Sequence, residues 1–222
     1  MVGGAFGIRK TDDEQRVISD LSVNDILDPA RLPRPRFAYT PRLRALVTTP
    51  GYIVAVRKRD ARHYFHRLRV GKRWYKYLGH PGIRGRDGQQ LVPVRTAAAM
   101  GFAPSAGWAQ GLTDEVAIRA GLPESRRVGF DLPGPLGLPA WGSIIDDMWS
   151  LEERKHRKLG DPEAAGWMRR TDAAWQDYDV PMNVKKSVDH GFNEEFQGTV
   201  VHDTKHWLGC SVQRRIRHLA AT

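Results

Sequence analysis

Ala140-Trp141-Gly142-Ser143-Ile144-Ile145-Asp146-Asp147-Met148-Trp149 is a largely apolar stretch that carries two adjacent aspartates. We expect a strand, a tight turn at the aspartates and a second strand that pairs with the first. Two carboxylates about 4 Å apart repel each other by roughly 4 kcal/mol at an effective dielectric constant of 20. Such a turn between apolar strands would be destabilising without a cation, so the stretch predicts an antiparallel strand pair that presents carboxylates to a cation.

Two helices are predicted around this strand pair. The first begins at Ser105, a candidate N-cap, and ends at Gly121. The second begins at Asp161-Pro162, where proline suits the first helical position, and ends before Pro181. The apolar stripes are Trp108, Leu112 and Val116 in the first helix, and Trp167, Met168, Thr171, Trp175 and Tyr178 in the second. Residues 122–140 hold four prolines and three glycines and are expected to form a loop.

Strands and irregular segments fill the rest of the chain. Residues 7–19 predict a hairpin, and residues 28–43, with four prolines, predict a basic and mostly irregular connector. Residues 52–56 predict a buried strand, residues 183–188 another strand, and residues 198–212 a second hairpin. Because strands and helices alternate irregularly, the pattern favours an α+β fold over a doubly wound sheet.

The charge of the chain is strongly basic. Its 222 residues carry a formal net charge of +10, and residues 31–76 hold fourteen Lys or Arg residues and a single acid, Asp60. A segment of this kind predicts contact with a phosphate backbone, with a solvated basic face as the alternative. One carboxylate isolated among cations suits a metal-binding role.

The sequence contains no recognisable signal peptide or membrane-spanning segment. No run approaches 18 consecutive apolar residues, and the first ten residues lack the apolar stretch of a signal peptide. A single cysteine, Cys210, excludes an intramolecular disulfide and fits a reducing compartment. We therefore expect an intracellular protein, cytoplasmic or nuclear, that does not bind membranes.

Three consecutive cations, Arg57-Lys58-Arg59, directly precede Asp60. A buried strand cannot hold three unpaired cations. We therefore expect this strand to be exposed at a sheet edge, distorted, or facing nucleic acid.

Six motifs, in order along the chain, resemble those of reverse transcriptases. Asp60-Ala61-Arg62-His63-Tyr64-Phe65-His66 is similar to the first palm motif, in which an aspartate at a strand end is followed five positions later by an aromatic residue. Residues 100–106, continuing to Gln110, resemble the second motif, and Ile144-Ile145-Asp146-Asp147 is similar to the third. The other three are Val180-Pro181-Met182-Asn183 with Lys185-Lys186-Ser187, then His206-Trp207-Leu208-Gly209, and upstream the fingers residues Arg9-Lys10, Arg16, Asp20 and Asn24.

The resemblance implies roles for individual residues. The implied metal ligands are Asp60, Asp146 and Asp147, with the Ala61 carbonyl contributing. Lys185, or its neighbour Lys186, would act as the general acid that protonates the leaving pyrophosphate.

Nucleotide and primer contacts are implied as well. The resemblance assigns Arg16 and Lys10 to the triphosphate, and places Gly101 near the template and the incoming nucleotide. Phe65 would lie under the incoming sugar, where its ring selects deoxynucleotides. The implied primer grip is Trp207, Leu208 and Gly209.

The implied architecture is a polymerase right hand of the α+β class. It has a palm, in which an antiparallel sheet packs on helices in a ferredoxin-like arrangement, and a fingers subdomain. We expect fingers at residues 1–48 and 69–105, palm at residues 49–68 and 106–212, and a basic tail at residues 213–222. The remaining length leaves little room for a thumb and none for ribonuclease H, as in a piece of a retroelement polyprotein or a truncated copy.

The expected function is RNA-directed DNA polymerisation with two Mg²⁺ ions, for which Mn²⁺ is a possible substitute. Its partners would be an RNA or DNA template-primer duplex and deoxynucleoside triphosphates. One alternative is an inactive remnant that serves only as a basic nucleic-acid-binding module. Another is an RNA-dependent RNA polymerase, against which Phe65 argues.

Overall fold

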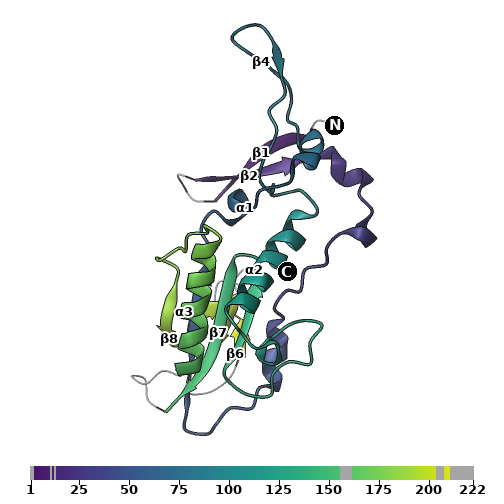
Figure 1. Cartoon of the computed structure of the whole chain (residues 1–222). Helices are drawn as coiled ribbons and strands as arrows, with labels where there is room; N and C mark the ends of the chain where they lie inside the picture. Colours follow the sequence, from purple (N-terminus) through teal and green to yellow (C-terminus); the bar gives the residue numbers. More distant parts are fainter. Residues whose placement is uncertain (1–2, 11, 13, 156–161, 204–207, 211–222) are drawn as a thin grey trace, which may run out of the picture. The chain divides into compact units, whose positions relative to one another are not determined.

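The computed structural model describes residues 3–10, 12, 14–155, 162–203 and 208–210 (Figure 1). The chain divides into two compact units, the first formed by Met1–Pro35 with His63–Ala109 and the second by Arg36–Arg62 with Gln110–Thr222. The boundaries expected from the sequence lay after residues 48, 68 and 105, and the naming of fingers and palm stays a prediction. The expected basic tail at residues 213–222 lies outside the described residues.

The first unit begins with the hairpin expected at residues 7–19. Strands β1 (Gly4–Arg9) and β2 (Gln15–Asp20) pair antiparallel, with Gly4 opposite Asp20. Two short 3-10 helices follow, Ser22–Ile26 and Pro29–Arg31. The proline-rich connector therefore contains only short helical turns.

The second segment of the first unit consists of short elements that pack around a small apolar core flanked by aromatic residues. They are α1 (Tyr64–Arg67), a 3-10 helix (Lys72–Tyr77), and the hairpin of β4 (Ile83–Arg84) with β5 (Gln90–Leu91). The buried core consists of Leu21, Val23, Val70, Leu78, Ala98, Ala99 and Phe102. Trp74, Phe102 and Trp108 pack edge to face around it.

The second unit is built on a four-stranded antiparallel sheet in the order β6-β7-β3-β8. Its strands are β3 (Ile53–Asp60), β6 (Ala140–Ile144), β7 (Asp147–Arg154) and β8 (Val188–Gly191). The strand pair predicted at residues 140–149 is confirmed as β6 and β7, with the turn at the aspartates. An antiparallel sheet with helices is the α+β class that we expected.

Two helices pack against the four-stranded sheet of the second unit. Helix α2 (Ser105–Arg119) begins at the predicted residue, and α3 (Pro162–Asp177) buries the predicted stripe residues Trp167, Met168, Thr171 and Trp175. Figure 1 shows α3 lying against the face of the sheet, and Gln110 of α2 donates a hydrogen bond to Ser143 of β6. Tyr178, the last predicted stripe residue, lies just beyond α3. The loop between α2 and β6 contains a short 3-10 helix, Glu124–Arg126.

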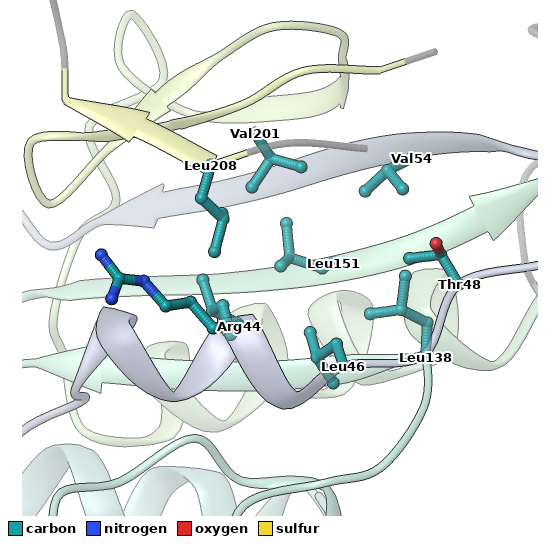
Figure 2. Close-up of a pocket in the computed structure, with 9 residues that line it drawn as sticks. Arg44, Leu46, Thr48, Val54, Leu138, Leu151, Val201 and Leu208 are labelled. Atoms are coloured by element: carbon teal, nitrogen blue, oxygen red, sulfur yellow. The ribbon is translucent and has the colours of Figure 1, made fainter. Parts of the chain in front are cut away.

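The opposite face of the sheet is covered by a smaller layer. It consists of a 3-10 helix (Thr40–Ala45) and a three-stranded sheet of β9 (Glu195–Phe196), β10 (Thr199–Val201) and β11 (Leu208–Cys210). Strands β10 and β11 confirm the hairpin expected at residues 198–212. An apolar cavity of about 250 Å³ lies between the layers, where Val54 and Leu151 face Val201 and Leu208 (Figure 2).

The three cations before Asp60 are not placed as expected. Strand β3 lies inside the sheet, between β7 and β8, and the arginines are buried, with Arg57 only 4% and Arg59 only 6% exposed. They are tolerated because each has acidic partners, Glu152 for Arg57, and Asp172 and Asp189 for Arg59. The expectation of an exposed edge was wrong, although the pairing of β3 with β8 shifts register between Val56 and Lys58.

A second expectation also fails, because residues 183–188 do not form a strand. Residues 184–186 form a turn in which the N–H groups of Lys186 and Ser187 both donate to the Asn183 carbonyl, and β8 begins only at Val188. No helix among the described residues has both the length and the apolar character to cross a bilayer.

Candidate active site

The second unit brings the three predicted aspartates to one end of its sheet. Asp60 is the last residue of β3 and Asp147 the first of β7, and the two are direct partners in the antiparallel register. Asp146 precedes Asp147 in the β6–β7 turn, and its carbonyl accepts a hydrogen bond of 2.9 Å from the Ala61 N–H. Strand pairing therefore assembles a site from segments more than 80 residues apart.

Asp60 is held by the segment that follows α3. Its carboxylate accepts hydrogen bonds from Asn183 Nδ2 at 3.0 Å and Lys186 Nζ at 2.8 Å, and its carbonyl accepts from the Asn183 N–H at 2.8 Å. The side chain of Asp60 is 14% exposed and that of Lys186 is 63% exposed. An ammonium group thus lies against the carboxylate at the rim of the site.

The lysine in contact with the carboxylate is Lys186 and not Lys185, which is exposed. The pKa of Lys186 is raised, first by its hydrogen bond to Asp60 and further by the charges of Asp60, Asp147 and Asp146, against the opposing effect of burial. The sequence did not separate the two lysines because the turn at residues 184–186, and not a strand, decides which one points to Asp60. Asn183 was named in the motif but had no assigned role.

Asp147 experiences the crowding of the three carboxylates most strongly. Its pKa is raised to about 7, first because surrounding protein displaces water from the carboxyl group and then because of the charges of Asp146 and Asp60. Asp147 as a whole residue is nevertheless exposed, so the displacement of water is only partial. The pair of like charges on its two sides is the more informative cause.

We expect Asp147→Asn to stabilise the metal-free protein more at pH 8 than at pH 5. The folded protein holds the Asp147 proton more tightly than the unfolded chain, so the carboxyl group reduces stability as the pH rises from about 4 through about 7. Screening by water limits the size of the difference. Thermal unfolding in a chelator at both pH values measures it, with Asp177→Asn on α3 as the matched control. A gain that is equal at pH 5 and pH 8 would contradict the assignment.

The donor set suits a hard divalent cation. Carboxylate oxygens are the ligands that Mg²⁺ prefers, and Lys186 places a positive charge on Asp60 where a metal ion would otherwise supply it. Among the described residues, no three His, Cys, Asp or Glu side chains are already arranged as a metal cluster.

The predicted nucleotide-binding residues, apart from Ala61, belong to the first unit. Lys10 pairs with Glu14 at 2.7 Å across the hairpin, and Arg16 is exposed on β2. Phe65, in α1, is half-buried against the aromatic core. Ala61 is buried beside the aspartates of the second unit.

Gly101 occupies a tight junction in the first unit. It has a φ of +96°, and a Cβ at this position would lie 2.0 Å from the Ser19 carbonyl oxygen. The Ser19 N–H donates to the Met100 carbonyl, and the Asn24 side chain bridges the Gly101 carbonyl and the Ala103 N–H. Asn24, assigned to the fingers motif, therefore has a structural role that the sequence did not indicate.

The predicted primer grip is described only in part. Leu208 and Gly209 lie in β11 opposite Val201 and Val200 of β10, and Leu208 lines the apolar cavity. Trp207 lies outside the described residues.

Comparison with known proteins addresses the fold. No protein-family model matches the chain, and no curated protein matches its sequence. Solved structures of foamy viral protease-reverse transcriptase match all of it. The TM-score is 0.65 at 14% identity for the complex with dsDNA, and 0.62 at 14% identity for the complex with an RNA/DNA hybrid.

The chain spans only 39% and 25% of the lengths of those two solved chains. The mixed α/β architecture with antiparallel sheets matches these structures over that length. The chain therefore has the fold of a reverse transcriptase domain, as the motif order indicated.

Proposed function

We propose that the chain is the fingers and palm of an RNA-directed DNA polymerase that adds deoxynucleotides to a primer. The observation that carries the proposal is the pairing of Asp60 with Asp147 across β3 and β7, with Asp146 in the adjoining turn. The fold supports it, as do the similar foamy viral structures, which are complexes with dsDNA and with an RNA/DNA hybrid.

Asp60, Asp146 and Asp147 would hold the Mg²⁺ ions, which when bound supply activation of the primer 3′-hydroxyl and neutralise charge on the leaving pyrophosphate. Lys186, like an ordinary lysine, carries its proton near neutral pH. Released from Asp60, its Nζ is the group placed to donate that proton to the leaving group. Lys10 and Arg16 would bind the triphosphate through charge-assisted hydrogen bonds.

Primer extension on an RNA template with deoxynucleotides and Mg²⁺ tests the proposal. The wild-type chain should extend the primer, and Asp146→Asn should abolish extension while leaving the fold and duplex binding intact. Asp177→Asn, a neutralised aspartate at the end of α3, is the matched control and should behave as wild type. Folded wild-type protein that extends no primer at any Mg²⁺ concentration would exclude this function.

Phe65→Ala should relax the choice of sugar. If the ring lies under the incoming sugar, its removal should increase ribonucleotide incorporation relative to deoxynucleotide incorporation by roughly 10- to 100-fold. Single-nucleotide insertion with each type of triphosphate measures the ratio. Tyr75→Ala, a half-buried aromatic residue against the same core, is the control for general loosening. An equal change in both variants would assign Phe65 to the core alone.

A second function, a binding module without catalysis, is favoured by one specific contact. Lys186 Nζ lies 2.8 Å from Asp60 Oδ2 and balances the charge of that carboxylate. Under this proposal the duplex binds with a steep dependence on salt, and Asp60→Asn leaves the affinity for Mg²⁺ unchanged. Selective Mg²⁺ binding that Asp60→Asn removes would reject the binding-only function.

A further inference from the structure

The turn that carries Asp146 and Asp147 has a strained backbone. Ile145, its first residue after β6, has a φ of +54°, in the left-handed region. A β-branched side chain rarely adopts this conformation, because its Cβ substituents crowd the backbone there. The surrounding structure must therefore hold the turn in place.

Two buried side chains of α2 form hydrogen bonds with the backbone of Ile145, one with its N–H and one with its carbonyl. Gln110, 1% exposed, accepts a hydrogen bond from the Ile145 N–H through Oε1 at 2.8 Å. Thr113, fully buried, donates from Oγ1 to the Ile145 carbonyl. Because both residues lie one turn apart on one helix, the turn is attached to α2 and not only to its own strands.

The orientation of the Gln110 amide is determined by its neighbours. Its Nε2 donates to Asp114 Oδ1 at 2.9 Å and to Ser143 Oγ at 2.9 Å. The Asp114 carboxylate also receives Arg127 Nη2 at 2.6 Å, which keeps it an acceptor. A carboxylate only accepts and a backbone N–H only donates, so the amide has one orientation that satisfies both ends.

We propose that Gln110 and Thr113 are positioning residues that hold the Ile145 peptide so that Asp146 and Asp147 face Asp60 in a geometry competent for a divalent cation. The inference rests on the proposed function for the identity of the cation. It assigns to α2 a role in the geometry of the carboxylates, in addition to its packing on the sheet.

The experiment compares near-isosteric variants in the full chain. Gln110→Met and Thr113→Val remove the bonds to Ile145 and preserve volume, whereas Thr113→Ser keeps the hydroxyl and should restore wild-type behaviour. Val116→Ala, fully buried on the same helix without a bond to the turn, is the control for lost stability. The readouts are Mn²⁺ affinity by calorimetry, kcat for single-nucleotide extension, and Kd for the template-primer.

We expect Gln110→Met and Thr113→Val each to weaken Mn²⁺ binding and lower kcat by tenfold or more, with the template-primer Kd within twofold of wild type. Thr113→Ser and Val116→Ala should change neither Mn²⁺ affinity nor kcat by more than about threefold. The positioning role of Gln110 and Thr113 is contradicted if Val116→Ala changes Mn²⁺ affinity as much as Gln110→Met does. It is also contradicted if Thr113→Ser is as impaired as Thr113→Val.

A wild-type chain that extends no primer and binds no Mn²⁺ would defeat the proposed function, and the positioning of the turn is then decided by hydrogen exchange. Amide exchange in residues 144–148 should accelerate at least tenfold in Gln110→Met and Thr113→Val, while exchange in the centre of β7 stays the same. Unchanged exchange at residues 144–148 in both variants overturns the inference.

Discussion

Glu152→Gln is expected to lower the free energy of unfolding of the second unit by about 3–5 kcal/mol. Glu152 is fully buried and lies between two buried arginines, with Arg57 Nε at 3.1 Å from Oε2 and Arg154 paired to Oε1. Replacing the carboxylate with an amide removes the nearest negative charge from both guanidinium groups and leaves Arg57 with the more distant Asp189, at 3.9 Å. Urea unfolding at pH 7, followed by tryptophan fluorescence, measures the loss.

Two further variants give this prediction its contrast. Glu115→Gln removes the exposed i,i+4 partner of Arg119 on α2 and should change stability very little. The triple replacement Arg57→Met, Glu152→Leu and Arg154→Met should be less damaging than Glu152→Gln alone, because it removes the charges together. If Glu152→Gln lowers the free energy of unfolding no more than Glu115→Gln does, water reaches the arginines and the ion pairs of Glu152 are not buried.

Gly101→Ala is expected to destabilise the first unit by roughly 3 kcal/mol, from backbone strain and a lost hydrogen bond. The new Cβ would lie 2.0 Å from the Ser19 carbonyl oxygen, a backbone atom that cannot turn aside. Strand β2 must then move away from the loop, and the bond from the Ser19 N–H to the Met100 carbonyl is lost. Amide exchange at Ser19 and chemical unfolding both report the change.

Gly88 provides the matched control for this prediction. It also has a positive φ, +81°, but a Cβ there meets nothing within 4 Å. Gly88→Ala should therefore cost about 1 kcal/mol, the conformational part alone. Equal costs at the two glycines would show that the contact with Ser19 yields without penalty.

Elements with a local signature were predictable from the sequence. The stripe of α3 repeats at helical spacing, and that helix was predicted with nearly correct ends. The turn between β6 and β7 was also predicted, but β7 continues to Arg154, beyond the predicted end at residue 149. The error at Arg57 and Arg59 has a different origin. Their partners Glu152, Asp172 and Asp189 lie 95 to 130 residues away in the sequence, so a strand that looks too charged to be buried becomes acceptable only in the fold.

The candidate site shows the same division. The grouping of Asp60, Asp146 and Asp147 was predicted from the adjacent aspartates in an apolar setting, from one acid in a basic field and from the resemblance to reverse transcriptase motifs, and their role as a site stays a prediction. Lys186 was not distinguished from Lys185, since the hydrogen bonds of the turn after Asn183 set which side chain returns to Asp60. Gln110 has no signal of its own, because its importance lies in bonds to the Ile145 peptide.

The buried ion pairs of β3 also help to fix the register between β3 and β7. Side chains alternate across a strand, so a slip of one residue between β3 and β7 would turn Arg57 and Arg59 toward the apolar face that carries Trp149 and Leu151. The same slip would separate Asp60 from Asp147. A chain that mispairs these strands therefore loses both the buried ion pairs and the pairing of Asp60 with Asp147. Only the correctly aligned sheet retains both.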